Sequence, residues 1–414
     1  MALYTLALTT SKAQLKRSLT LPLLTLYGLG TILGAGVYVL VGKVAGVAGI
    51  YTPIAFLVSA LVAAFTGFSY AKLSSRYPRS AGEAIYVSQA FAWPTLSACV
   101  GGFVIATGVV SAATLVNGFV GYLSVFMPMP ELTAITLVIL LITGIACWGI
   151  TESVTIAAIV TAIELSGLVI VLAALNVELS TLTERWPDLV PSADKGIWLG
   201  ILLGAHLAFY AFIGFEDMVN VVEEVVDPKR TMPLAILLAL GIASLLYILI
   251  ALAAILSLPL NELNASNSPM VSLLETKSEK LATIIGIISL IAILNGALVQ
   301  IIMGARMLYG MSTQKLAPSV FGNISNKTQT PIRATLFIGI IIWLLAAALP
   351  LVALAKITSS IILVVFTLVN ASLVVIQFRE VNKFSELSLS FFLPVIGGFL
   401  CIGLLSLQLL FMIN

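Results

Sequence analysis

The chain has 414 residues, of which 60% are apolar and 9% are charged, against about 45–50% and about 25% in soluble domains. Its mean hydropathy is +1.14, and its 20 basic and 18 acidic residues leave a net charge of only +2. This composition excludes a soluble multidomain enzyme. The balanced charge also excludes the basic surface that binds nucleic acid. We therefore expect an integral membrane protein whose surroundings are the lipid bilayer.

Apolar segments of the length that crosses a bilayer, about 20 residues, recur along the whole chain. They cover residues 21–43, 50–73, 94–126, 131–150, 153–175, 197–226, 232–257, 281–312, 332–354, 356–377 and 389–412. These runs are too long and too uniformly apolar for the strands of a membrane barrel. The loops are too short to fold alone, although the longest could form short surface helices. The sequence predicts one all-α transmembrane domain of about eleven helices over residues 1–414.

Basic residues are divided unevenly between the two sides of this predicted bundle. If the N-terminus is cytoplasmic, the segments on that side hold fourteen of the 20 Lys and Arg residues, and the other side holds six. The positive-inside rule favours this orientation. We therefore expect a multi-pass protein of the cell (inner) membrane with a cytoplasmic N-terminus. The first apolar run has no AxA-like cleavage site, so no removable signal peptide is expected.

Two predicted spans carry features that interrupt a helix. The first span has four glycines in the nine residues 28–36, and each glycine costs about 1 kcal/mol in a helix interior. A close helix contact through Gly30 and Gly34 is the alternative reading of this segment. The sixth span is interrupted near Gly214, and two adjacent acids begin two residues later. Matching interruptions in two halves indicate a transporter site between inverted repeats.

The spacing of the two interruptions predicts how the helices are grouped. They fall in the opening helices of two sets of five, with one repeat at about 21–175, a second at about 197–377, and an extra helix at about 389–412. After its break, the first span resumes with unpaired N–H groups and a positive helix dipole, which attract a carboxylate. The first half of the sixth span ends with free carbonyls, which attract an ammonium group. A ligand with both groups on one carbon, an α-amino acid, fits between the two breaks.

Several motifs resemble those of the amino acid, polyamine and organocation permease superfamily. They are GTILGAGVY in the first span, PRSAGE at 78–83, TESVTIAAIVTAIE in the fifth span, AFIGFEDMVNVVEEVVDPKRTMPLAI across the sixth and GARMLYGMSTQKLAP after the eighth. The resemblance extends over about residues 20–380. It implies a leucine-transporter-like fold of five plus five inverted helices, with helices 1 and 6 broken at mid-membrane. It also implies an amino acid permease, not an enzyme.

The resemblance further implies which residues hold the backbone of the amino acid. The substrate-binding residues carried over are Ile32, Gly34, Ala35 and Gly36 in the first span, Tyr210, Ala211, Phe212, Ile213 and Gly214 in the sixth, and Gln300 in the eighth. Within this set, the residues at 32, 35 and 36 would bind the carboxylate and those at 211–213 the ammonium group. Tyr210 would form an aromatic wall.

Two acids within the predicted spans are candidates to carry a coupling proton, because charges inside a membrane are costly and usually functional. Glu216 matches an acid that follows the sixth-span break in many relatives and is the first candidate. Glu164 in the fifth span is the second, and it stands where many relatives have a lysine. Its alternative role is that of a protonated donor to a neighbouring helix. The sequence predicts neither a metal site nor a cofactor.

The leading interpretation is proton-coupled amino acid uptake by alternating access. A sodium-coupled or exchange-only carrier of amino acids or polyamines is the alternative. Sodium is disfavoured because residues 292–311 contain no Ser, Thr or Asp to supply side-chain oxygen ligands. For His206, the only histidine, a hydrogen bond at a helix interface is favoured over a pH-sensing role. Neutral or cationic substrates, and a monomer or a homodimer, remain open at this stage.

Overall fold

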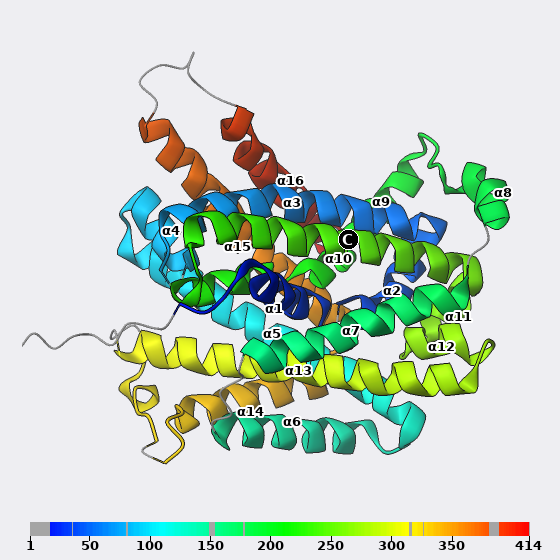
Figure 1. Ribbon diagram of the computed structural model, residues 1–414, viewed down its shortest axis with the longest axis horizontal. Coiled ribbons are helices and arrows are strands. Elements are labelled where there is room, and N and C mark those ends of the chain that lie inside the picture. Colours follow the sequence, from blue (N-terminus) through cyan, green and yellow to red (C-terminus); the bar gives the residue numbers. More distant parts are fainter. Residues whose placement is uncertain are drawn as a thin grey trace, which may run out of the picture.

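The computed structural model describes residues 17–34, 36–79, 82–148, 154–176, 179–313, 317–325, 327–380 and 389–413. Within these ranges the regular structure is helical, apart from one isolated bridge between Leu19 and Val225. Most helices run roughly along the long axis of the molecule (Figure 1). We call the end at which the first helix begins the proximal face, on the left in Figure 1, and the opposite end the distal face.

The helices are long ones that cross the bundle and short elements in the breaks and connections, and α1 and α2 together form one crossing. The long ones are α1 (Leu21–Leu33), α2 (Gly36–Ala48), α3 (Thr52–Arg76), α5 (Pro94–Phe126), α6 (Glu131–Trp148), α7 (Val154–Leu175), α9 (Lys195–Ala208), α10 (Pro228–Ser257), α13 (Glu279–Thr313), α14 (Ile332–Ala348), α15 (Leu351–Glu380) and α16 (Leu389–Ile413). The short elements are η1 (Gly49–Tyr51), α4 (Gly82–Phe91), α8 (Leu179–Leu189), η2 (Phe209–Phe212), η3 (Phe215–Glu224), α11 (Leu260–Ala265), α12 (Pro269–Glu275) and η4 (Ser319–Phe321).

The surface of the bundle is apolar. Nine helices among the described residues are long and apolar enough to cross a membrane, and α1 and α14 are shorter apolar helices. Leu140 and Phe399 are 65% and 71% exposed, as expected where lipid replaces water around the protein. Trp93 and Trp148 are exposed at the proximal face and Trp186 on the distal helix α8, and Trp is enriched at both boundaries of a membrane. The prediction of a multi-pass helical membrane protein is confirmed.

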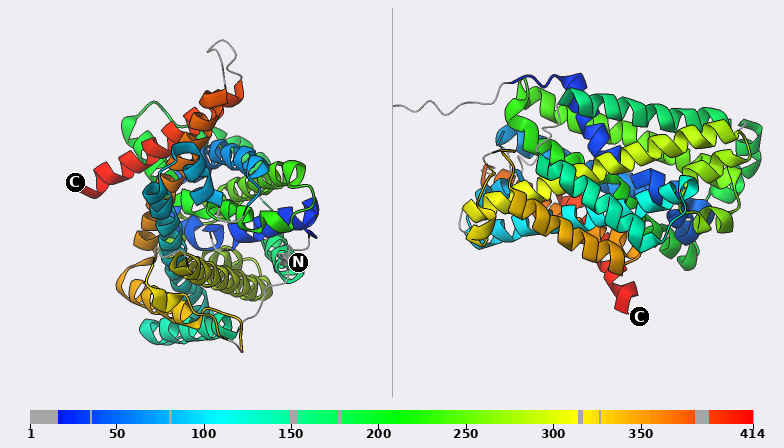
Figure 2. Two further views of the ribbon diagram at one scale, coloured as in Figure 1. Left: turned by 90° about the vertical axis from the view of Figure 1, so that its left-hand side faces the viewer. Right: turned by 90° about the horizontal axis from the view of Figure 1, so that it is seen from below.

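The interrupted segments lie inside this bundle. Helix α5 packs against α13 and α15, while α10 packs against α3 and α1. The pair α6 and α14 lies at one edge and α16 lies on the opposite side, against α15 and α3 (Figures 1 and 2). Between them, ten of the thirteen residues of α2 are buried, and so is every residue of η2. The fold therefore surrounds two non-continuous helices with continuous ones.

Some predicted boundaries differ from the structure. The border predicted at 354–356 is wrong, because it falls inside α15, which begins at Leu351. Pro350 explains the shift, since proline lacks an N–H and disfavours helical geometry in the residue before it, so that α14 ends at Ala348. Helix α4 at the proximal face was not predicted. The short surface helices expected in the long loops are present as α8, α11 and α12.

Candidate substrate-binding site

The first break divides the first predicted span into α1 and α2. Helix α1 ends at Leu33, and the N–H of Gly34 donates to the Gly30 carbonyl at 3.2 Å. The carbonyl of Ile32 accepts a hydrogen bond of 2.9 Å from the hydroxyl of Tyr247, a fully buried residue of α10. A backbone carbonyl at membrane depth needs such a partner. Ala35, predicted to bind the carboxylate, lies outside the described residues.

The second break is longer and lies in the sixth predicted span. The α-helix ends at Ala208, six residues before Gly214, near which the break was predicted, and passes into the 3-10 turn η2. Ile213 is extended (φ −68°, ψ 137°) and Gly214 has a φ of 125°, which favours glycine. The chain then continues as η3, a 3-10 helix of 10 residues, whereas such helices rarely exceed about four.

The two breaks are in direct backbone contact. A Cβ atom on Gly36 would clash with the Cα atom of Ala211. A Cβ atom on Gly214 would clash with the carbonyl of Thr31 and lie 3.0 Å from the nitrogen of Ile32. Glycine at 36 and 214 therefore permits the approach of the two chains.

A cavity lies beside this contact. Residues of both breaks and of α5, α7 and α13 line it, and ligand sites commonly lie between the helices of a bundle. Of the predicted substrate-binding residues, those that line it are Ile32, Gly34, Gly36, Tyr210, Ile213 and Gln300. Ala211 instead packs on Gly36, Phe212 packs its ring on Tyr247 at 5.2 Å, and the N–H of Gly214 donates to Glu216.

Polar side chains from four helical segments face this cavity. They include Ser111 of α5, Thr161 of α7, Asp217 of η3 and Asn295 of α13. The Tyr210 hydroxyl lies 3.1 Å from the Ser111 hydroxyl. Sequence reasoning did not select Ser111, Thr161 or Asp217 as site residues. Ser111 and Thr161 are isolated hydroxyl residues in apolar spans. A hydrogen bond to a neighbouring helix explains such a residue equally well.

The two adjacent acids of η3 have different partners. Oε2 of Glu216 accepts the N–H of Gly214 at 2.8 Å, so Glu216 closes the break within its own segment. Oδ2 of Asp217 accepts a longer bond of 3.4 Å from the amide of Gln300. Both acids are buried. Asp217 is therefore the acid on the wall of the cavity, and Glu216 supports the backbone behind it.

A second, smaller cavity adjoins the first on its proximal side. It shares Ile213, Asp217 and Gln300 with the first cavity. Its other lining residues are Val104, Thr107, Gly108, Glu216, Met303, Gly304, Met307 and Ile362. On α5 and α13, these positions are closer to the proximal face than those that line the first cavity. The second cavity therefore lies between the first cavity and the proximal face.

Two further predicted residues lie away from the cavities. Glu164 is fully buried on α7, and its backbone carbonyl accepts a bond of 2.7 Å from the Tyr38 hydroxyl. It lines neither of the two cavities described above. His206 is fully buried, with Nε2 3.2 Å from the Ser360 hydroxyl of α15. That contact is of the kind expected for a histidine at a helix interface.

The distal side of the first break is covered by α11, α12 and the loop between them. The Lys43 ammonium donates to the Asn264 carbonyl at 2.7 Å and lies 3.4 Å from Oδ1 of Asn267. The Tyr122 hydroxyl donates to the Tyr38 carbonyl at 2.6 Å and accepts the Met270 N–H at 3.3 Å. These contacts join α2, α5 and α12 above the cavity.

Comparison with known proteins places this arrangement in a family. The model of the amino acid permease family matches residues 19–414. "Cationic amino acid transporter 2, vacuolar" of Arabidopsis thaliana is 32% identical over 88% of this chain, but the match covers only 60% of the plant protein. In Bacillus subtilis (strain 168), a branched-chain amino acid permease is 27% identical over 91% of this chain and 84% of its own length. A methylthioribose transporter of the same bacterium is 27% identical over 95% and 87%.

These relatives are transporters and permeases, which confirms the prediction that the chain is not an enzyme. The chain spans less than two thirds of the length of the plant relatives that it matches. The resemblance to the permease superfamily is likewise confirmed. The chain belongs to the amino acid permease family.

Proposed function

We propose that this protein is a secondary active transporter that moves an amino acid across the membrane by alternating access, driven by protons. One observation carries the proposal: the two helix breaks contact each other beside a cavity that both of them line. Two relatives that match over most of this chain are named as amino acid transporters or permeases. They differ in the amino acid that they are named for, so the proposal does not specify the substrate side chain.

The polarity of the two breaks supports an α-amino acid as ligand. Helix α2 begins at Gly36 on the wall of the cavity, and the start of a helix attracts a carboxylate through its N–H groups and dipole. Helix α9 and the turn η2 end towards the same cavity, at Phe212, and the end of a helix attracts a cation. The carboxylate of Asp217 adds a negative charge on that side. A zwitterion can satisfy both ends together.

Alternating access is supported by the unequal covering of the two ends. Helices α11 and α12 cover α2 at the distal face, whereas the second cavity extends the site towards the proximal face. We take the proximal face as cytoplasmic, from the distribution of basic residues. In this arrangement the substrate would be released to the cytoplasm. Related motion of two five-helix repeats, α1–α7 and α9–α15, would expose the site on the other side.

Proton coupling is supported by the acids around the second break. Glu216 and Asp217 are buried next to each other, where two ionised carboxylates would repel and binding of a proton would be favoured. Glu164 remains a second candidate, buried behind the first break near Tyr38. Protonation of an acid at the break would alter the charge that the substrate ammonium meets, and so link proton binding to substrate binding.

Uptake of labelled amino acids into proteoliposomes tests this proposal. An inward proton gradient should accelerate uptake, and replacement of sodium by choline should leave it unchanged. Uptake that requires sodium, or that requires amino acid inside the vesicle, would replace proton symport by a sodium-coupled or an exchange mechanism. No uptake of any amino acid or amine would exclude the proposed function.

A further inference from the structure

One buried acid has no place in the site described so far. Glu83 lies in the first turn of α4 at the proximal face and is only 3% exposed. Its Oε1 accepts a hydrogen bond of 3.2 Å from the hydroxyl of Tyr70, a fully buried residue of α3. A buried acid of this kind needs an explanation, because removing a charge from water is costly. Helix α4 is not among the helices long enough to span the membrane.

Tyr70 connects this acid with the second break. Its ring packs edge-on against Phe215, the first residue of η3, with centroids 5.3 Å apart. Its hydroxyl interacts electrostatically with both Glu83 and Glu216. Glu83 in turn interacts with Asp217, which lines the substrate cavity. Tyr70 thus contacts the first residue of η3 through its ring and the acid at the proximal face through its hydroxyl.

A second hydroxyl faces Glu83 from its own helix. Tyr86, one turn further along α4, is fully buried and interacts electrostatically with Glu83. Its hydroxyl has no hydrogen-bond partner among the described residues, and it lies 2.8 Å from where a Cβ atom on Gly82 would be. A buried hydroxyl without a protein partner is a site for a hydrogen-bonded proton carrier such as water. This observation is independent of the bonds among the acids.

In the part of the chain that the structure describes, no Lys or Arg side chain forms an ion pair with Glu83. Helix α3 contributes Tyr70, and η3 contributes Glu216 and Asp217. Helix α5 contains no charged residue. From α15, Arg379 donates to the Gln89 carbonyl and Glu380 pairs with Arg76, so both are engaged elsewhere. Glu83 is surrounded by acids and hydroxyls.

This environment allows Glu83 to change its protonation state near neutral pH. Burial raises the pKa of Glu83 to about 7 from its ordinary value of 4.5. Its backbone hydrogen bond and the Tyr70 hydroxyl act in the opposite direction, and the charge of Asp217 raises the pKa further. A group that both gains and loses protons at cytoplasmic pH is suited to proton transfer.

We propose that Glu83 accepts the coupling proton from the Glu216–Asp217 pair, by way of the Tyr70 hydroxyl, and releases it at the proximal face. The proton leaves a carboxyl oxygen of the pair for the Tyr70 oxygen as Tyr70 passes its own proton to the Glu83 carboxylate. The pair is then ionised, Tyr70 is unchanged and Glu83 is neutral. Glu83 next loses the proton to water on the proximal side. This inference rests on the proposed proton-coupled transport and assigns its exit step.

Proteoliposomes of the full chain can test this role with Glu83→Gln. The probe is a mixture of the common ¹⁴C-labelled amino acids, and two rates are measured: gradient-driven uptake, and exchange at equal pH against the same mixture inside. Exchange requires no net proton release, so we expect it to stay within twofold of wild type. Gradient-driven uptake should fall at least tenfold. Wild-type uptake should also accelerate as the internal pH rises from 6 to 8, because Glu83 must be ionised to accept a proton, and Glu83→Gln should lose this dependence.

One variant is a matched control and another is a second test. Glu131→Gln makes the same change in the first turn of α6, at an exposed position, and should behave as wild type. Tyr70→Phe keeps the ring packing but removes the hydroxyl, and should reduce gradient-driven uptake while exchange continues. If Glu83→Gln does not fold, Tyr70→Phe carries the test by the same two rates.

The outcomes separate this inference from the proposed function. Gradient-driven uptake at the wild-type rate in Glu83→Gln, or in Tyr70→Phe if that variant carries the test, would overturn the role of Glu83 and leave proton-coupled transport intact. Equal loss of exchange and uptake in the variant would overturn it too, because it would indicate a structural role. Wild-type uptake that ignores the gradient would overturn both the coupling and the exit step.

Discussion

The two helix breaks meet at one site but are stabilised in different ways. The first separates α1 from α2 by only two residues, and its freed Ile32 carbonyl is satisfied by Tyr247 from another helix. The second extends from Phe209 to Glu224, where two 3-10 segments flank the extended Ile213 and the positive φ of Gly214, and its Gly214 N–H is satisfied by the neighbouring Glu216. The first break is thus stabilised by a residue of another helix, and the second by an acid of its own segment.

This difference assigns different tasks to the two segments. A carbonyl bound by a residue of a distant helix keeps its position as long as that helix does, so the first break can present a fixed helix start to the substrate. A long 3-10 stretch has poorer hydrogen bonds and is often found at hinges. The second break therefore combines the more deformable backbone with the ionisable groups. The predictions below test this division, starting from the largest expected effect.

Substitution of Gly214 by alanine should abolish transport. At its φ of 125°, a side chain is strained, and the added Cβ atom would also clash with the Thr31 carbonyl of the first break. Since neither backbone can yield without opening the contact, we expect uptake into proteoliposomes to fall by more than a hundredfold. Gly144→Ala on α6 has no heavy atom within 4 Å of the new Cβ and should leave uptake unchanged. Near-normal transport by Gly214→Ala would mean that the contact between the breaks is not needed.

The buried acid Glu83 should make the stability of the protein depend on pH. Because the pKa of Glu83 rises from 4.5 to about 7 on folding, its neutral form favours the folded state. Its contribution is fully present below pH 4.5 and is lost as the pH rises through 7, a change of about 3 kcal/mol at about 1.4 kcal/mol per pH unit. Melting temperatures in detergent should fall over this range for wild type. The difference between wild type and Glu83→Gln measures the effect, and parallel curves would contradict it.

Removal of the Tyr247 hydroxyl should weaken the first break without abolishing it. In Tyr247→Phe the ring contacts with Phe56 and Phe212 remain, but the buried Ile32 carbonyl loses its donor. Leaving such a group unsatisfied costs about 1–3 kcal/mol. We expect a lower melting temperature and an apparent substrate affinity reduced about tenfold. The protonation-dependent part of uptake should persist, because it belongs to the second break. Loss of the pH dependence in Tyr247→Phe would show that the two breaks are not separable.

The sequence predicted the helical fold because hydropathy over 20 residues is a strong signal, and it located both breaks because glycine and acids at membrane depth are rare. It was less informative about partners. Tyr247 and Ser111 stand in the sequence as ordinary residues of apolar spans, and only the packing of α10 and α5 brings their hydroxyls to the breaks. Glu83 entered only as the last residue of the PRSAGE motif and was given no role, since an acid in a segment between two spans normally faces water. The neighbouring acids Glu216 and Asp217 could not be distinguished until their partners were known.

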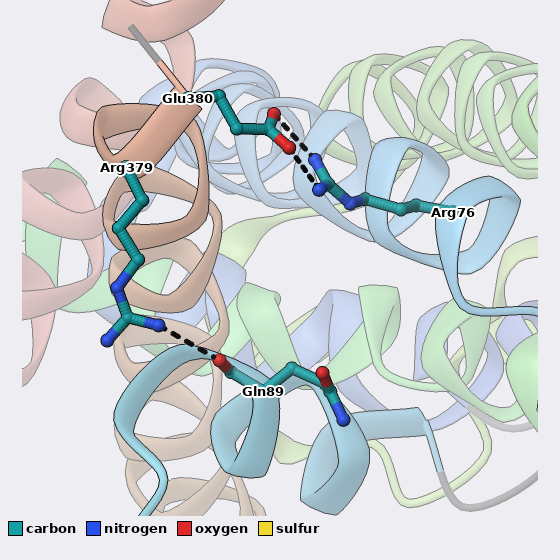
Figure 3. A network of polar contacts seen from close by, with 4 residues as sticks. All are labelled: Arg76, Gln89, Arg379 and Glu380. Carbon is teal, nitrogen blue, oxygen red and sulfur yellow. Dashed lines mark hydrogen bonds and ion pairs between the residues drawn. The ribbon is translucent and has the colours of Figure 1, made fainter.

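An ion pair at the proximal face provides the smallest expected effect. Arg76 of α3 pairs with Glu380 of α15, and Arg379 donates to the Gln89 carbonyl of α4 at 3.3 Å (Figure 3). The side chains of Arg76 and Glu380 are 41% and 51% exposed, and exposed pairs contribute about 0–1 kcal/mol.

Substitution Arg76→Gln should therefore change the free energy of unfolding by less than about 1 kcal/mol and uptake by less than twofold. A double-mutant cycle with Glu380→Gln isolates the pair from other effects of each change. If the coupling energy were instead several kcal/mol and transport slowed in proportion, the joining of α3 to α15 would limit the conformational change. Contacts at the proximal face would then limit transport more than the difference between the two breaks does.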